Sequence, residues 1–250
     1  MSQPFQQAKI IRDNKYNETT YLRNPTMKNH KKIEQIFELL FQYYGDQFWW
    51  PAKSTSEIFL GAILTQGTTW KNAEKALSKL SQNSDLSIES IDNMSITFLE
   101  ETIRSSGYFR AKTRTIKQFI GLIKNRYDSD FDYMQSFKTE LLRLHLLSIK
   151  GIGEETADAM LLYGLNKPTF VIDNFTMRII SRIGLLSNDS NYNDFQRLFT
   201  QNLAQVTTTF QQFHALLVKH AQTSCLKTKP KCRNCCLKNL CTFGRKNNKS

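Results

Sequence analysis

All five cysteines of the chain lie close together near its C-terminal end. Cys225, Cys232, Cys235 and Cys241 follow the spacing C-x6-C-x2-C-x5-C, and Cys236 is the spare thiol. Four thiolates at short spacing can hold zinc or a [4Fe–4S] cluster. Zinc fingers usually group their ligands in two closely spaced pairs, and this spacing does not. The cysteines therefore predict a metal site rather than disulfide bonds.

Two glycines, Gly151 and Gly153, separate two amphipathic segments, and Lys150 precedes them. Glycine permits positive φ angles, so both positions suit a tight reversal of the chain. Ile152, between them, can anchor the turn in the core. The backbone N–H groups that follow such a turn can hold a phosphate. An ordinary helix–helix turn would show the same glycine pattern, so the motif gains meaning only from its surroundings.

The elements that must position these residues are helices. Apolar residues recur at helical spacing from Ile33 to Phe41, and 54–57 (Ser-Thr-Ser-Glu) is typical of a capping box that opens a helix through Ile63. Further helices are predicted over 71–80, 98–104, 111–124, 141–149, 154–163 and 174–183. Asp173 suits the N-cap of the last one. Because strand signals are few, we expect an all-α fold.

Composition and charge limit the possible functions. A chain of 250 residues with 40% hydrophobic residues can bury a core in one or two packed domains. The net charge of +12 is concentrated at the two ends: residues 219–250 hold nine Lys or Arg and no acidic residue. Basic ends on a near-neutral body favour a polyanionic partner over a merely solubilising tail. With no long apolar run and no secretory signal, we expect a cytoplasmic, nucleoid-associated protein with no membrane contact.

The residues around the hairpin resemble a known family. The run 147–153 (Leu-Ser-Ile-Lys-Gly-Ile-Gly), followed by Thr156-Ala157 and Val171-Ile172-Asp173, is similar to the hairpin and Gly/Pro-Asp signature of the endonuclease III superfamily of DNA glycosylases. The segments 64–68 (Leu-Thr-Gln-Gly-Thr) and 107–112 (Gly-Tyr-Phe-Arg-Ala-Lys) also recur in that family. The resemblance extends from about residue 31 to 245.

The resemblance implies a role for Asp173. An aspartate at this position lies at the mouth of the base pocket in the family, where a carboxylate stabilises the positive charge that develops on the sugar and can orient or deprotonate water. Capping a helix is compatible with that role. Bifunctional members carry a lysine before the Thr-Ala pair, and its amine forms a Schiff base with the sugar. Here the position is Glu155, which cannot do so, and water is the expected nucleophile.

The aromatic residues resemble one branch of the family. Trp49-Trp50-Pro51, the run 64–70 with Trp70, and Glu155 are similar to the 3-methyladenine glycosylases built on the endonuclease III plan. The resemblance implies that Trp50 and Trp70 sandwich the flipped base, that Gln66 fills the gap left in the duplex and that Glu155 contributes to the base pocket. Aromatic faces bind cationic alkylated purines well. Ordinary core packing is the alternative for such a cluster of aromatic residues.

The cysteine spacing matches the iron–sulfur loop of endonuclease III, which implies a [4Fe–4S] cofactor. Lys227, Lys229 and Lys231 would then present positive charge to DNA phosphates, as would the hairpin residues Lys150, Gly151 and Gly153. Some alkylation-specific relatives lack this cluster, so the chain combines features of two branches.

We therefore expect two helical subdomains with a helix-hairpin-helix motif and a cluster loop. The expected ranges are a flexible polar extension at 1–30, a glycosylase core at 31–220 with its hairpin at about 147–157, the cluster loop at 221–245 and a basic tail at 246–250. The expected activity is monofunctional removal of alkylated purines from double-stranded DNA by a monomer. Three alternatives remain: a uracil or mismatched-thymine glycosylase, a bifunctional endonuclease III-like glycosylase/lyase, and a non-catalytic iron–sulfur sensor of DNA damage.

Overall fold

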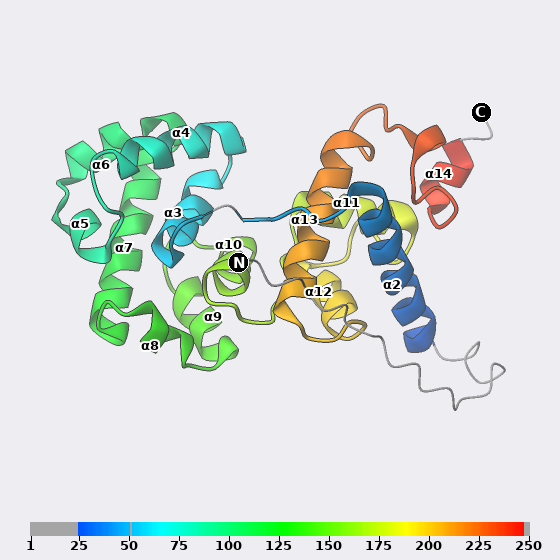
Figure 1. Cartoon of the computed structure of the whole chain (residues 1–250), viewed down its shortest axis with the longest axis horizontal. Helices are drawn as coiled ribbons and strands as arrows, with labels where there is room; N and C mark the ends of the chain where they lie inside the picture. Colours follow the sequence, from blue (N-terminus) through cyan, green and yellow to red (C-terminus); the bar gives the residue numbers. More distant parts are fainter. Residues whose placement is uncertain (1–24, 51, 248–250) are drawn as a thin grey trace, which may run out of the picture.

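The computed structural model describes residues 25–50 and 52–247, and within these ranges it contains helices and irregular segments but no strand. The helices form two lobes that lie side by side along the long axis of the molecule (Figure 1). The all-α fold expected from the sequence is thus confirmed. Most of the expected polar extension, part of the basic tail and Pro51 lie outside the described residues. None of the helices in the described part is long and apolar enough to cross a bilayer.

The first lobe is built from consecutive helices in the middle of the chain. These are α3 (Thr55–Thr65), α4 (Trp70–Ser81), α5 (Ile88–Asn93), α6 (Ile96–Thr102), the 3-10 turn η1 (Arg104–Ser106), α7 (Phe109–Tyr127), α8 (Phe131–Gln135), α9 (Thr139–Leu147) and α10 (Glu154–Ala159). Their apolar faces meet around fully buried side chains such as Phe59, Ile120 and Leu142. Helices α9 and α10 flank the glycine hairpin.

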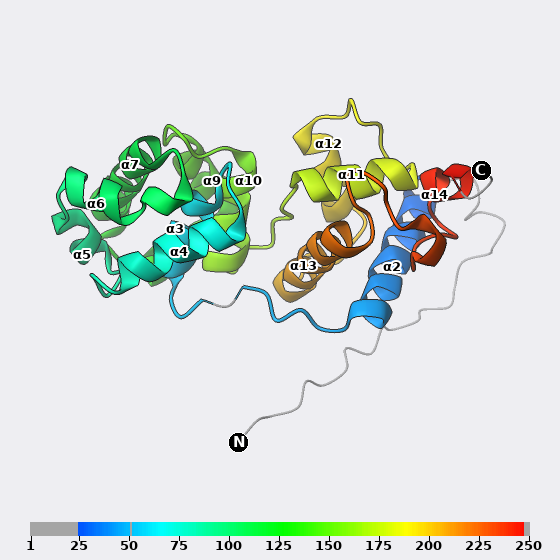
Figure 2. The same cartoon turned by 90° about the horizontal axis from the view of Figure 1, so that it is seen from above.

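The second lobe combines the two ends of the described chain. It contains α2 (Pro25–Tyr44), α11 (Asn174–Ile183), α12 (Tyr192–Thr200), α13 (Thr207–Thr223), the 3-10 turn η3 (Cys232–Asn234) and α14 (Thr242–Asn247). Phe170, Phe199 and Phe213 form the centre of its core, with the rings of Phe170 and Phe199 stacked 3.8 Å apart. Seen from above, the chain crosses between the lobes at the segment before α3 and at the segment before α11 (Figure 2).

Two predicted helix starts differ in detail. Helix α2 begins at Pro25, within the range expected to be a flexible extension. Ser54 caps α3 as predicted, because its side chain accepts a hydrogen bond from the backbone N–H of Glu57. The reciprocal half of the predicted capping box is wrong: the Glu57 carboxylate accepts from the N–H of Lys53, one residue before the cap, at 2.7 Å.

The helix predicted over 154–163 changes its winding halfway. It is α-helical only to Ala159 and continues as a π-helical segment, η2 (Met160–Gly164). Met160 packs in the first core and Tyr163 in the second. A Cβ at Gly164 would lie 2.3 Å from the ring of Phe59, so only glycine permits this close approach to α3. The wider winding thus directs consecutive side chains into both lobes.

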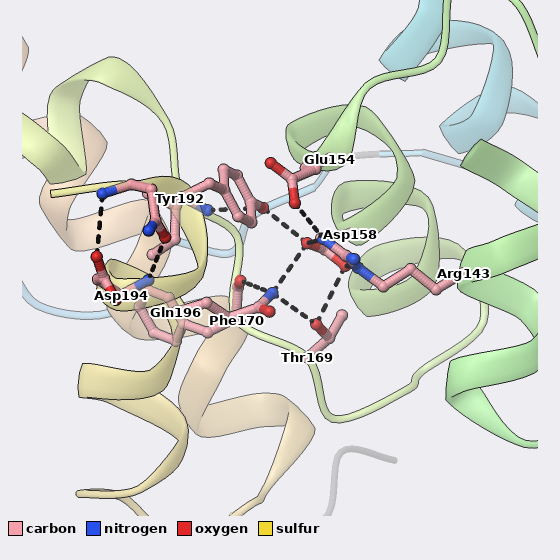
Figure 3. Close-up of polar contacts among 10 residues, drawn as sticks. Arg143, Glu154, Asp158, Thr169, Phe170, Tyr192, Asp194 and Gln196 are labelled. Carbon is pink, nitrogen blue, oxygen red and sulfur yellow. Dashed lines mark hydrogen bonds and ion pairs between the residues drawn. The ribbon is translucent and has the colours of Figure 1, made fainter.

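A buried aspartate, Asp158 on α10, holds the lobes together (Figure 3). Arg143 on α9 donates to both of its oxygens, at 2.8 and 3.0 Å. From α12 in the other lobe, Tyr192 donates to Oδ2 at 2.7 Å and Gln196 at 2.9 Å. The Thr169 hydroxyl donates to Oδ1 at 3.3 Å. Because one carboxylate accepts hydrogen bonds from side chains of both lobes, these contacts fix the geometry between the lobes.

Candidate active site

The glycine hairpin is seated on α7 and on the end of α3. Gly151 has φ +100°, which favours glycine, and a Cβ there would lie 2.3 Å from the hydroxyl of Thr115. The backbone conformation and the close contact therefore each require glycine at this position. Gly153 has φ −94°, so the positive φ that glycine permits is used at Gly151 and not at Gly153. Ile152 is buried as predicted, and Lys150 is exposed. The turn therefore presents Lys150 and its own backbone to solvent.

Gln66 ties the end of α3 to the hairpin. Its side-chain amide donates to the carbonyl of Gly151 and to the hydroxyl of Thr156, each at 2.8 Å. Tyr108, at the start of α7, lies beside the next residue, Gly67, and is 76% exposed. The sequence analysis named the segment 107–112 but assigned no role to Tyr108 within it. Gln66 and Tyr108 thus flank the hairpin on one surface.

Asp173 caps α11, as its sequence position predicts. Its Oδ1 accepts a 2.6 Å hydrogen bond from the backbone N–H of Thr176, and the residue is 8% exposed. Its Oδ2 lies 3.6 Å from Nε2 of His214, which is on α13. Burial alone would raise the pKa of Asp173, but the facing imidazole and the Thr176 N–H stabilise the charged form and hold that pKa below its ordinary value. Asp173 is therefore ionised at neutral pH.

His214 and Tyr163 are the residues that sequence reasoning missed. The Tyr163 hydroxyl lies 2.7 Å from His214 Nδ1, and both side chains are buried. Burial and the charge of Asp173 raise the pKa of Tyr163 well above its ordinary value, so its proton stays in place. No helix was predicted over α13, so a histidine within an apolar run was the only available signal. Its partner could not be known because Asp173 lies in a different helix.

Glu155 stands at the start of α10 and shares the site with Asp173. Its side chain is open to solvent, yet protein surrounds it on enough sides that desolvation, together with repulsion from Asp173, raises its pKa from 4.5 to about 7. The facing His214 opposes this shift. Two carboxyl groups with opposite pKa shifts therefore share one site, which is typical of catalytic centres.

The three tryptophans gather where the lobes meet. Trp50 and Trp70 touch edge to face, with ring centroids 5.2 Å apart and planes at 87°. Trp50 lies on α3 at Gly61, where a Cβ would be 3.1 Å from the indole, and its ring is 5.5 Å from that of Tyr163. The two rings contact one another in this structure, and the sandwich of a flipped base between Trp50 and Trp70 stays a prediction. The aromatic cluster nevertheless adjoins Tyr163, and through it His214 and Asp173.

The four predicted ligand cysteines are brought together. Cys225, Cys232, Cys235 and Cys241 line one small cavity with apolar side chains from α11, and Cys236 does not line it. The Arg182 guanidinium donates to the Cys225 sulfur at 3.3 Å, and His220 Nε2 lies 3.6 Å from the Cys235 sulfur. Within residues 25–50 and 52–247, no three His, Cys, Asp or Glu side chains are arranged to hold a single metal ion. The exposed Lys227, Lys229 and Lys231 lie on the loop that begins this cysteine group.

Comparison with known proteins agrees with this architecture. Residues 60–205 match the HhH-GPD superfamily of base excision DNA repair proteins. A protein of Methanocaldococcus jannaschii described as a DNA repair glycosylase is 38% identical over 218 residues, which cover 86% of this chain and 99% of the relative.

Two solved structures share the fold. An endonuclease III bound non-covalently to DNA has a TM-score of 0.76 at 18% identity and covers 88% of this chain and 99% of its own. The 3-methyladenine DNA glycosylase of Helicobacter pylori, bound to 1,N6-ethenoadenine, has a TM-score of 0.64 at 24% identity and covers 78% and 97%. The match over more than half of the sequence, with its hairpin and its buried Asp173, places this chain in the HhH-GPD superfamily, as a base-excision DNA glycosylase that acts on N-glycosyl bonds.

Proposed function

We propose that this glycosylase is monofunctional and hydrolyses the bond between deoxyribose and an alkylated, 3-methyladenine-like purine, leaving an abasic site. The observation that carries the proposal is Glu155 at the start of α10, beside Asp173, where the family resemblance places the Schiff-base lysine of bifunctional members. A carboxylate cannot form a Schiff base, so the protein supplies no covalent nucleophile at this position.

Asp173 carries the chemistry in this proposal. As the bond between the base and C1′ breaks, the electron pair leaves with the base and positive charge develops on the sugar. The ionised Asp173 stabilises that charge from its place at the N-cap of α11. The oxygen of a water molecule then bonds to C1′, and its proton passes to the carboxylate.

The tryptophan cluster supports a flipped, electron-poor base as the substrate. Trp50 adjoins Tyr163, which contacts His214, so a base bound beside the indoles would lie on the side of the cluster that leads to Asp173. Because Trp50 and Trp70 touch edge to face, the two rings must part before a base can stack between them. Stacking and cation–π attraction then favour a cationic alkylated purine.

A second candidate substrate is a neutral base such as uracil or mismatched thymine. Glu155 favours it, because a carboxyl group with a pKa of about 7 is partly protonated at neutral pH and can donate a hydrogen bond to a departing oxygen. A cationic base needs no such donor to leave.

The deciding experiment is a panel of duplexes, each with one lesion, treated with enzyme and then with or without alkali. The proposal predicts that the alkylated purine is released and that the strand stays intact until alkali is added. Excision of uracil or mismatched thymine alone would show that the second candidate, a neutral base, is the substrate. A protein–DNA adduct trapped with borohydride would refute the monofunctional mechanism. The variant Lys150→Ala would then test whether the hairpin lysine forms that adduct. If no duplex in the panel loses a base although lesions are bound, the non-catalytic sensor is favoured.

We further propose that the chain binds double-stranded DNA as a monomer through the hairpin and the lysine loop. Lys227, Lys229 and Lys231 are exposed on that loop. Each phosphate contact contributes about −0.9 to the slope of log affinity against log salt. Replacing the three lysines by alanine should flatten the slope by up to about three such contacts. Lys124→Ala, which removes a charge that is paired with Asp92, is the control, and an equal effect of both variants would refute the assignment.

The four cysteines that line the cavity fit a [4Fe–4S] cluster. Four cysteine side chains line one cavity with apolar walls, and Arg182 donates to the sulfur of one of them, which supports a cluster held by Cys225, Cys232, Cys235 and Cys241. Protein purified without oxygen should contain about four irons per chain. Cys236→Ser should keep the iron and Cys232→Ser should lose it. Stoichiometric zinc, or loss of iron in both variants, would contradict this ligand set.

A further inference from the structure

Tyr163, His214 and Asp173 come from three elements and lie in a row. The Tyr163 hydroxyl is 2.7 Å from His214 Nδ1 and 3.4 Å from the carbonyl of Gln211. We place the tyrosine proton on the shorter contact, which makes Nδ1 the acceptor. The ring proton of a neutral histidine then resides on Nε2, the nitrogen that faces Asp173. Tyr163 thereby fixes the tautomer of His214.

His214 Nε2 is a buried polar atom without a hydrogen-bond partner in the described structure. It lies 3.6 Å from Asp173 Oδ2, too far for a hydrogen bond but close enough for electrostatic attraction between the N–H dipole and the buried carboxylate. The other oxygen of Asp173 is already occupied by the Thr176 N–H. The titratable side chains that face Asp173 are His214, Tyr163 and Glu155.

We propose that His214, oriented by Tyr163, is the positioning residue that keeps Asp173 ionised and fixed for catalysis. The proposal rests on the role assigned to Asp173 above. The helix-cap bond is the hydrogen bond that the Asp173 carboxylate accepts in the described structure. Without the nearby N–H of His214, the charged form of this buried carboxylate would lose its electrostatic support, and the protonated form would become more favourable. Glu155 adds to this need, because a second carboxyl group in the same site repels the charge on Asp173.

The test is the pH dependence of excision, measured in single turnover with the duplex that the panel selects. The rate of the wild type should fall at acid pH only as Asp173 becomes protonated. In His214→Leu the acid limb should move to higher pH by about one unit or more. His214→Gln keeps an N–H donor and should restore part of the shift, and Tyr163→Phe should move the limb less than His214→Leu does. A lower rate with an unmoved limb would show that His214 only packs, and overturn the proposal.

His145→Leu is the matched control. Nδ1 of His145 also lies within hydrogen-bond distance of a tyrosine hydroxyl, that of Tyr127, at 2.6 Å, but no carboxylate within residues 25–50 and 52–247 forms an ion pair with this histidine. The acid limb of the pH–rate profile of His145→Leu should stay where it is in the wild type.

A second readout needs no substrate. Carbon NMR of the aspartate carboxyl groups in the intact protein, with Asp173→Asn used to assign the signal, should show a higher pKa for Asp173 in His214→Leu. An unchanged pKa would overturn the inference even if activity fell. Full activity of Asp173→Asn would instead refute the proposed function, because the catalytic carboxylate would then lie elsewhere.

Discussion

Two buried aspartates, Asp158 and Asp173, show how the same residue type serves different ends in two regions of the molecule. Asp158 is fully buried, and side chains of both lobes donate to its two oxygens (Figure 3). Asp173 is 8% exposed, uses one oxygen as a helix cap and faces His214 with the other across 3.6 Å. A fully bonded carboxylate stabilises a fixed geometry. A carboxylate with incomplete bonding keeps the capacity to respond to a developing charge.

The largest effect on stability should come from Asp158→Leu. It leaves the largely buried Arg143 with only the longer 3.4 Å contact to Glu154, so we expect a loss of about 3–5 kcal/mol in the free energy of unfolding. Urea unfolding measures it, and the double variant Arg143→Met/Asp158→Leu should recover a large part. A loss below about 1 kcal/mol, the range of an exposed pair, would show that this network does not hold the lobes together.

Asp173→Asn should reduce excision by on the order of a hundredfold or more while the protein still binds the lesion duplex. Its stability should change little, because asparagine also caps helices well. Single-turnover kinetics and urea unfolding should be measured on the same preparation. If Asp173→Asn lost as much stability as Asp158→Leu and kept its activity, both carboxylates would be structural, which contradicts the separate roles assigned to them.

Tyr192→Phe probes one bond of the Asp158 network alone. The hydroxyl donates to Asp158 Oδ2 at 2.7 Å, and its removal should cost about 1–2 kcal/mol of stability. The excision rate of the folded variant should remain that of the wild type, because the tyrosine acts on the fixed carboxylate. A strong loss of excision activity without loss of stability would mean that the Asp158 network also controls the excision reaction.

Glu155→Gln should have the smallest effect, and it depends on pH. The pKa of Glu155 is raised from 4.5 to about 7, so the folded state binds its proton more tightly than the unfolded state does. Its contribution to stability is therefore fully present below about pH 4.5 and is lost as the pH rises through 7. Relative to wild type, Glu155→Gln should gain in melting temperature between pH 5 and pH 8. A difference in melting temperature that stays constant over this pH range would show that neither desolvation nor Asp173 raises the pKa of Glu155.

The local features of this protein could be predicted from its sequence because each depends on near neighbours in the chain. Helical periodicity predicted α4, α7 and α11 to within a few residues, although α12 and α13 were not predicted. Asp173 followed an apolar run in the position of a cap. Gly151 marked the hairpin, because no other residue fits its φ and its contact with Thr115. The cysteine spacing predicted one shared site, which the common cavity matches.

Tertiary structure alone decided which distant residues meet. His214 faces Asp173 only because α13 packs against α11, and Tyr163 reaches both because the π-helical segment directs it into the second lobe. The edge-to-face contact of Trp50 and Trp70 likewise depends on how the segment before α3 lies across Gly61. Periodicity reports which side of a helix is apolar, but it carries no information on the partner helix. The protonation state of Asp173 and Glu155 is set by those partners, and so it follows from packing rather than from spacing in the chain.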